Sequence, residues 1–133
     1  MKIKTAFFLT LFLTSAFQHP PLSSLVRVSL DQIQEAFQKA DAHLLAEHFA
    51  SSVEIGLRND QKTYSKIQAE FVMRRFFQKN KVKEFIVLEQ GRERNNHYVW
   101  AKYKTSSESY QMFLSLQGNG TSLLIRKIDI KKA

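Results

Sequence analysis

The hydrophobic pattern of this chain changes near residue 80, from the period of a helix to the period of a strand. Residues 63–80 read TYSKIQAEFVMRRFFQKN, and their apolar side chains recur at i, i+3, i+4 and i+7. These positions are Ala69, Val72, Met73 and Phe76. Ser65 and Gln68 precede them as a capping box, in which the serine hydroxyl accepts from the backbone N–H of Gln68. The stretch therefore predicts an amphipathic helix.

From Lys83 onward, apolar and polar residues alternate, as in strands that bury one face. Four segments follow this pattern: residues 83–93, 96–105, 108–117 and 121–131. Turn-forming residues separate them, namely Asn95-Asn96, Ser106-Ser107 and Gly118-Asn119-Gly120. Short links between long strands predict an antiparallel meander.

Shorter elements are predicted ahead of the central helix. Ser29 and Gln32 form a second capping box, which predicts the start of a first helix. Asp41 is expected to end that helix and cap a short second one over 42–49, although one bent helix is the alternative. Residues 53–57 and 62–64 predict two short strands around a turn. Helices, a hairpin and a meander in this order predict an α+β fold with helices on one face of a curved sheet.

The order of elements resembles the cystatin-like α+β roll of the nuclear-transport-factor-two-like superfamily. More narrowly, residues 63–80 are similar to the YSKxQAExxxxxFFxKN stretch of an exported bacterial family known as domain of unknown function 4783. The likeness covers roughly residues 29–131. It implies a cystatin-like roll with three helices packed on the concave face of a curved antiparallel sheet. It implies no activity, because the family has none assigned and the superfamily fold hosts both enzymes and binding modules.

The first 16 residues have the pattern of a secretory signal peptide. Lys2 and Lys4 form a basic start, residues 6–13 are almost wholly apolar, and small residues at 14–16 suit a signal peptidase. The apolar run is far shorter than the ~20 residues that span a bilayer, although an N-terminal membrane anchor is the alternative. We therefore expect an exported protein, periplasmic or secreted after cleavage behind Ala16, that does not span the membrane.

Residues 17–28 contain His19-Pro20-Pro21 and are expected to form an extended tether, because a proline holds the residue before it in extended backbone. Residues 29–133 are enough for a single roll domain and too few for two. The chain has no cysteine, so disulfides are excluded and the hydrophobic core alone must hold an exported domain together.

The chain is basic, with a formal net charge of +8 at pH 7, but its charges are dispersed. Acidic residues interrupt the densest basic region, between Arg74 and Lys104. Proteins that bind nucleic acid more often gather their basic residues on one element of a recognisable module. We therefore expect no nucleic-acid partner.

The sequence holds no metal-ligand spacing, nucleophile motif or glycine-rich phosphate loop, so it predicts no metal, no cofactor and no catalytic residue. A roll of this kind can open a pocket between its helices and the sheet. Four residues are candidates for lining it: His48, Tyr64, Glu54 and Asp60. A histidine can act as a general base near neutral pH, whereas ordinary packing is the alternative for both His48 and Tyr64.

The sheet offers a second candidate surface, because residues that alternate along a strand point to opposite faces. One face of the strand from residue 96 is expected to carry the interface candidates Tyr98, Trp100, Lys102 and Lys104. The other carries Val99, Ala101 and Tyr103. In the last strand, alternation places Leu124, Ile128 and Ile130 opposite Leu123 and Ile125. Apolar groups on both faces need a second cover, and we expect a homodimer that pairs through the sheet.

Taken together, the sequence predicts an exported, non-catalytic module that binds a small molecule or assembles with a partner. The alternative is a small-molecule isomerase or dehydratase that uses a pocket histidine or aspartate as general base. An enzyme requires at least two titratable groups that converge in a pocket open to solvent, whereas a binding module does not.

Overall fold

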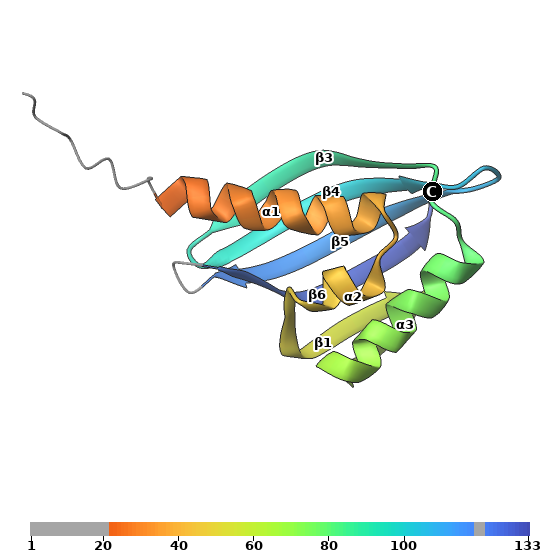
Figure 1. The fold of residues 1–133 in the computed structure, drawn as a ribbon, viewed down its shortest axis with the longest axis horizontal. Coiled ribbons are helices and arrows are strands. Elements are labelled where there is room, and N and C mark those ends of the chain that lie inside the picture. The colour runs from red at the N-terminus through yellow and green to blue at the C-terminus, as the bar shows by residue number, and fades with distance from the viewer. Residues whose placement is uncertain (1–21, 119–121) are drawn as a thin grey trace, which may run out of the picture.

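The computed structural model describes residues 22–118 and 122–133, so the expected signal peptide lies outside the described residues. Three helices and six strands make up the described part of the chain, in an α+β fold with one curved sheet (Figure 1). In chain order they are α1 (Leu22–Gln38), α2 (Ala42–Ala46), β1 (Phe49–Leu57), β2 (Asp60–Ser65), α3 (Lys66–Lys79), β3 (Glu84–Glu93), β4 (Asn96–Lys104), β5 (Ser109–Gly118) and β6 (Leu123–Lys132). The α+β class predicted from the sequence is confirmed.

The six strands lie in the order β2-β1-β6-β5-β4-β3. Strands β3 to β6 form the predicted antiparallel meander, and β1 and β2 form the predicted hairpin. The hairpin joins the meander through β1 and β6, which run parallel. The expectation of a wholly antiparallel sheet is therefore wrong at this pair. Strands that are distant in sequence can pair in parallel, because the long intervening chain serves as the crossover connection.

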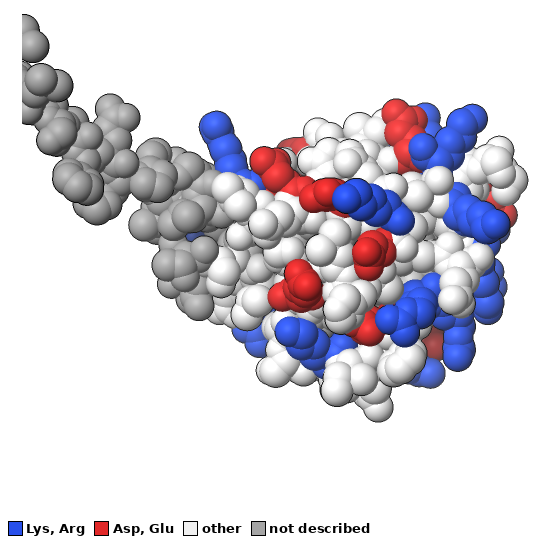
Figure 2. Space-filling model, in the orientation of Figure 1, with Lys and Arg blue, Asp and Glu red and all other residues white. Residues whose placement is uncertain are grey.

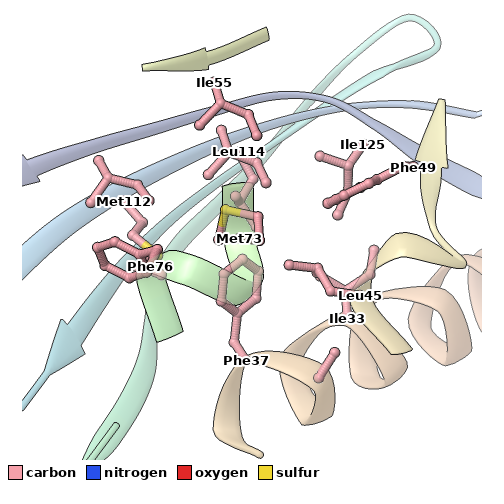
Figure 3. Packing of buried hydrophobic residues seen from close by; sticks show 14 of the residues in the cluster. Ile33, Phe37, Leu45, Phe49, Ile55, Met73, Phe76, Met112, Leu114 and Ile125 are labelled. Atoms are coloured by element: carbon pink, nitrogen blue, oxygen red, sulfur yellow. The ribbon is translucent and has the colours of Figure 1, made fainter. Parts of the chain in front are cut away.

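The helices cover one face of the sheet, with α1 over the β3 side and α3 over the β1 side (Figure 1). Side chains from all three helices meet those of the strands in one hydrophobic core (Figure 3). The largest fully buried side chains include Phe37, Leu45, Met73, Tyr103, Met112 and Leu114. This packing fixes α3 against the sheet and so positions the cavity described below.

Helix α3 begins as the sequence predicts. The Ser65 hydroxyl accepts from the Gln68 backbone N–H at 3.3 Å, and the Gln68 side chain accepts from the Ser65 N–H at 3.3 Å. This completes the capping box, which satisfies two backbone donors that a helix start leaves open. The helix buries Ala69, Met73, Phe76 and Phe77, while Val72 is half-buried. The predicted stripe is therefore the core-facing side of α3.

Helix α1 begins earlier than the capping box at Ser29 predicts. Residues 22–28, expected as part of an extended tether, are helical. Ser29 is buried within the helix, one turn before the core residue Ile33. A proline is tolerated in the first turn of a helix, so the prolines at 20 and 21 do not prevent a helix from starting at Leu22. The second helix is separate, as predicted, and the Asp41 side chain caps it by accepting from the Leu44 N–H at 2.9 Å. The prediction that it extends to residue 49 is wrong, because it ends at Ala46 and Phe49 begins β1.

Strand β6 departs from simple alternation. Its pairing with β5 shifts register between Ser115 and Leu116, which leaves Arg126 as an extra residue opposite the partner strand. Such a β-bulge changes which face the following side chains occupy. Leu123, Ile125, Ile128 and Ile130 are consequently all buried under the helices. The expectation that Ile128 and Ile130 share a face with Leu124 is wrong for this reason.

Among the described residues, no helix is both long and apolar enough to cross a membrane.

Candidate functional site

A cavity of about 370 Å³ opens between α3 and the hairpin side of the sheet. Its walls come from β1, β2, α3, β5 and β6, so five elements converge on it. The apolar wall residues are Leu57, Phe71, Val72, Phe76 and Ile130, and two tyrosines, Tyr64 and Tyr110, complete the wall. This volume lies within the range of about 300–1,000 Å³ that is usual for ligand pockets.

Packing fixes the inner wall of the cavity. The ring of Phe76 contacts Tyr110, with 5.5 Å between ring centroids, and Tyr103, with 5.3 Å. Phe76 and Tyr110 are each only 7% exposed. Tyr64 is held on the helix side of the sheet because it pairs across the hairpin with Val53, which is buried. Contacts within the protein therefore hold these rings in the cavity wall.

A hydrogen-bond network closes one end of the cavity at Asn80. Its side chain donates to the Phe76 carbonyl at 3.0 Å, and its own carbonyl accepts from the Tyr103 hydroxyl at 2.5 Å. The Tyr110 hydroxyl lies 2.8 Å from Asn80 Oδ1 and 2.8 Å from Glu108 Oε2. The hydroxyl has one proton, so Tyr110 donates to one of these two oxygens at a time. The network ties the end of α3 to β4 and β5.

Burial and hydrogen bonds in the same network shift the pKa values of three side chains. Burial raises the pKa of Tyr110, and its hydrogen bond to Glu108 adds to the rise. Hydrogen bonds from Tyr110 and Lys132 lower the pKa of Glu108, because they stabilise its carboxylate. Burial also raises the pKa of Tyr103, with a smaller contribution from Tyr110. At neutral pH both phenols are therefore neutral and Glu108 is charged.

Four basic side chains complete the lining: Arg58, Arg75, Lys79 and Lys132. Arg58 lies in the β1–β2 turn with φ 50°, while Arg75 and Lys79 are one turn apart on α3. In Figure 2, Lys and Arg side chains are densest toward the lower right of the view, over α3. The cavity thus combines apolar walls with a cationic rim.

Sequence reasoning missed this rim, although a signal for it exists. Val72, Arg75, Phe76 and Lys79 stand at i, i+3, i+4 and i+7, so they form one stripe of α3 that alternates apolar and basic side chains. The stripe predicted from the sequence starts at Ala69, and Arg75 and Lys79 lie outside it. The spacing from Val72 would have grouped them with the wall.

Only one of the four predicted pocket residues lines the cavity, namely Tyr64. His48 follows α2, is half-buried, and has its pKa lowered by that burial. Glu54 alternates with the buried Val53 and Ile55, which places it on the sheet face opposite the helices. Asp60 is exposed at the start of β2, and its Oδ2 lies 3.6 Å from Nζ of Lys62. The structure therefore does not bring these four residues together.

The four predicted interface residues do lie on one surface, the sheet face opposite the helices, because they alternate with the buried Val99, Ala101 and Tyr103. Phe113 stands opposite Trp100 on the neighbouring strand. Its ring lies 4.7 Å from that of Trp100 and 5.8 Å from that of Tyr98, measured between centroids. Trp100 remains 45% exposed despite this contact. We call Tyr98, Trp100 and Phe113 the outer aromatic cluster.

A separate polar cluster lies on the flank of α3 that faces α2. Glu70 accepts from Arg74 at 2.9 Å and lies 3.0 Å from Nδ1 of His43. His43 is highly exposed, and Glu70 is already paired with Arg74, so the three form a hydrogen-bonded surface network outside the cavity. Within the described part of the chain, no group of three or more His, Asp or Glu residues could hold a metal ion.

The sequence profile of the family described as Domain of unknown function (DUF4783) matches residues 30–131 of the chain. A crystal structure of a DUF4783 family protein from Bacteroides ovatus is 24% identical, with a TM-score of 0.74 over 77% of this chain and 93% of that one. Another, from Bacteroides uniformis, is 22% identical, with a TM-score of 0.73 over 77% and 95%.

More distant structures show the same fold. An NTF2-like protein of unknown function from Shewanella baltica is 11% identical, with a TM-score of 0.63 over 84% of this chain and 93% of that one. No curated protein matches the chain. At these identities the solved structures establish the fold and leave the activity to be argued from the site.

Proposed function

We propose a function for this chain, which belongs to the DUF4783 family of NTF2-like proteins. It is a non-catalytic module that binds a small molecule in the cavity beside α3. The resemblance carried by residues 63–80 predicted this family correctly. The family name assigns no activity, so it is the cavity that supports a function. We also infer the cystatin-like form of the roll, with the helices on the concave side of the sheet.

The chemistry of the cavity wall carries this proposal. Of the described residues that line the cavity, none is a histidine, aspartate or glutamate. Histidine, aspartate and glutamate are the side chains that most often transfer protons near neutral pH, whereas the titratable groups of this lining are tyrosines, lysines and arginines. The wall consists of aliphatic and aromatic side chains already held by packing, which suits the binding of an apolar group.

Binding of an uncharged apolar dye, N-phenyl-1-naphthylamine, tests the proposal. We expect its fluorescence to rise on addition of the protein and the signal to saturate. Val72→Trp places a larger side chain against the cavity and should abolish the signal, whereas Ile67→Trp should leave it unchanged, because Ile67 is 72% exposed and lies outside the cavity lining. Equal binding by both variants would contradict the proposed site.

A second function, self-association, is favoured by the outer aromatic cluster. No helix covers that face of the sheet within the described residues, and Trp100 is 45% exposed on it. An apolar patch on a surface otherwise rich in charge often marks an interaction site. We propose that two copies pair through this face, and the variant that tests the pairing is argued at the end of the Discussion.

We propose that the protein is exported, because its first 16 residues have the basic, apolar and small-residue order of a signal peptide. N-terminal sequencing of protein from the envelope or medium of the producing cell should start at Phe17 or within a few residues of it. A product that retains Met1 would instead support the anchor alternative.

A further inference from the structure

The basic side chains at the cavity converge from separate parts of the fold. Arg58 comes from the β1–β2 turn, Arg75 and Lys79 from α3, and Lys132 from the end of β6. Each alternates with or adjoins an apolar wall residue: Arg58 follows Leu57, and Arg75 and Lys79 flank Phe76 on the helix. The apolar walls and the cations therefore belong to one site.

Three of these cations make no ion pair with a described residue, although Arg58 lies near enough to Glu108 to help lower the pKa of its carboxyl. Among the described residues, Arg58, Arg75 and Lys79 make no ion pair, whereas the adjacent Arg74 pairs with Glu70 at 2.9 Å. Lys132 is the exception at the rim, because its Nζ lies 3.2 Å from Glu108. Like charges one turn apart on a helix repel each other, so Arg75 and Lys79 carry an electrostatic cost that a bound anion would relieve.

We propose that the cavity binds a small organic anion, with its apolar body against Val72, Phe76 and Ile130 and its carboxylate or phosphate at Arg58, Arg75 and Lys79. The inference rests on the proposed function and adds the chemical class of the ligand. Arginine donates paired hydrogen bonds that match the geometry of carboxylates and phosphates. The cavity, at about 370 Å³, is near the lower end of the range for ligand pockets, which limits the ligand to a small molecule.

Three probes that share an eight-carbon chain and differ in the head group test this proposal by calorimetry. Octanoate should bind at least tenfold more tightly than octanol, and octylammonium should bind more weakly than octanol. Added salt should weaken octanoate binding and leave octanol binding little changed, because salt screens charges. Equal affinities for octanoate and octanol would overturn the inference while leaving the proposed apolar site in place.

Charge-removing variants locate the head group. The double variant Arg75→Gln/Lys79→Gln should weaken octanoate binding about tenfold and leave octanol binding unchanged, since each exposed ion pair makes a modest contribution. The matched control Arg27→Gln/Lys127→Gln removes the same charge at positions outside the cavity lining and should bind octanoate as wild type does. An equal loss in both variants would show a general effect of net charge and overturn the assignment.

Arg58→Asn is the second variant, because asparagine adopts the left-handed backbone of this position more readily than most residues. It should weaken octanoate binding severalfold with an unchanged circular dichroism spectrum. Unchanged octanoate affinity in this variant and in the double variant would overturn the inference. Absence of binding by octanoate and octanol alike, at millimolar concentration, would overturn both the proposed function and the inference that rests on it.

Discussion

Phe76 links the hydrophobic core to the cavity, since its ring contacts Phe77, Tyr103 and Tyr110 and also forms part of the cavity wall. Phe76→Ala should lower the free energy of unfolding by about 3 kcal/mol, at the low end of the range for Phe→Ala, because one side of the ring already faces open space. Chemical denaturation at neutral pH measures this loss.

The control is Phe71, which lies five residues earlier on the same helix. Phe71 is 59% exposed and touches the guanidinium of Arg74, with 5.3 Å to the ring centroid. Phe71→Ala should therefore change the stability by less than about 1 kcal/mol. A loss below about 1 kcal/mol for Phe76→Ala would mean that the buried stripe of α3 is assigned wrongly.

Tyr103 makes the stability of the folded protein depend on pH in the alkaline range. Burial raises its pKa above the value of about 10 that the unfolded chain has. A raised pKa in the folded state stabilises the protein below the unfolded pKa, and this contribution is lost as the pH rises through the folded value. We therefore expect the melting temperature to fall above pH ~10.

Tyr103→Phe separates this effect from general alkaline denaturation. At pH 7 the variant should lose about 1 kcal/mol, because the Asn80 carbonyl loses the hydrogen bond from the phenol. Above pH ~10 its melting temperature should fall less steeply than that of wild type. Parallel curves for the two proteins would contradict the assignment of the pH dependence to Tyr103.

At the scale of elements, the start of α3 depends on one side chain. Ser65→Ala removes the hydroxyl that accepts from the Gln68 N–H and should destabilise the protein by about 1 kcal/mol. Ser106→Ala, in the exposed β4–β5 turn, is the control and should have little effect. Thermal unfolding of both variants compares them directly, and equal stabilities would show that the capping box contributes nothing measurable.

The elements that the sequence predicted well are those whose signals are local. The capping box at Ser65 and the turn-forming residues between the long strands each act within a few residues, so α3 and the meander were predicted. The parallel pairing of β1 with β6 joins segments that are distant in sequence, and the bulge at Arg126 is a register shift between the neighbouring strands β5 and β6. Alternation alone carries no information about either, which explains why Ile128 and Ile130 were assigned to the wrong face.

At the scale of the whole molecule, the candidate site was only partly predictable for a related reason. Tyr64 was identified from its place just before the helix cap, a local feature. Lys132 and Arg58 reach the cavity because β6 pairs with β1, and no local pattern brings residues 58 and 132 together. A wall built from five elements can be recognised only after the strand order is known.

The outer face of the sheet supports a prediction about assembly. The bulge in β6 turns Ile128 and Ile130 inward, so the apolar groups of this face include the outer aromatic cluster, the exposed Leu124 and Ile86, which pairs with Lys102. Charges of both signs surround the cluster, with Lys102 on β4 and Glu89 opposite Trp100 on β3. In a two-fold dimer the same patch meets itself, so a lysine of one copy can face a glutamate of the other.

Sedimentation should therefore show a dimer for wild type at tens of micromolar. Trp100→Lys should be monomeric and still folded by circular dichroism, because Trp100 is 45% exposed and points away from the helices. Ile67→Lys, which adds the same charge at an exposed position of α3, should remain dimeric. The twist of the sheet and the lysine stems could shield the rings without a partner, and a wild type that stays monomeric would establish that alternative. Loss of the dimer in both variants would show that added charge, and not the aromatic contact, drives the dissociation.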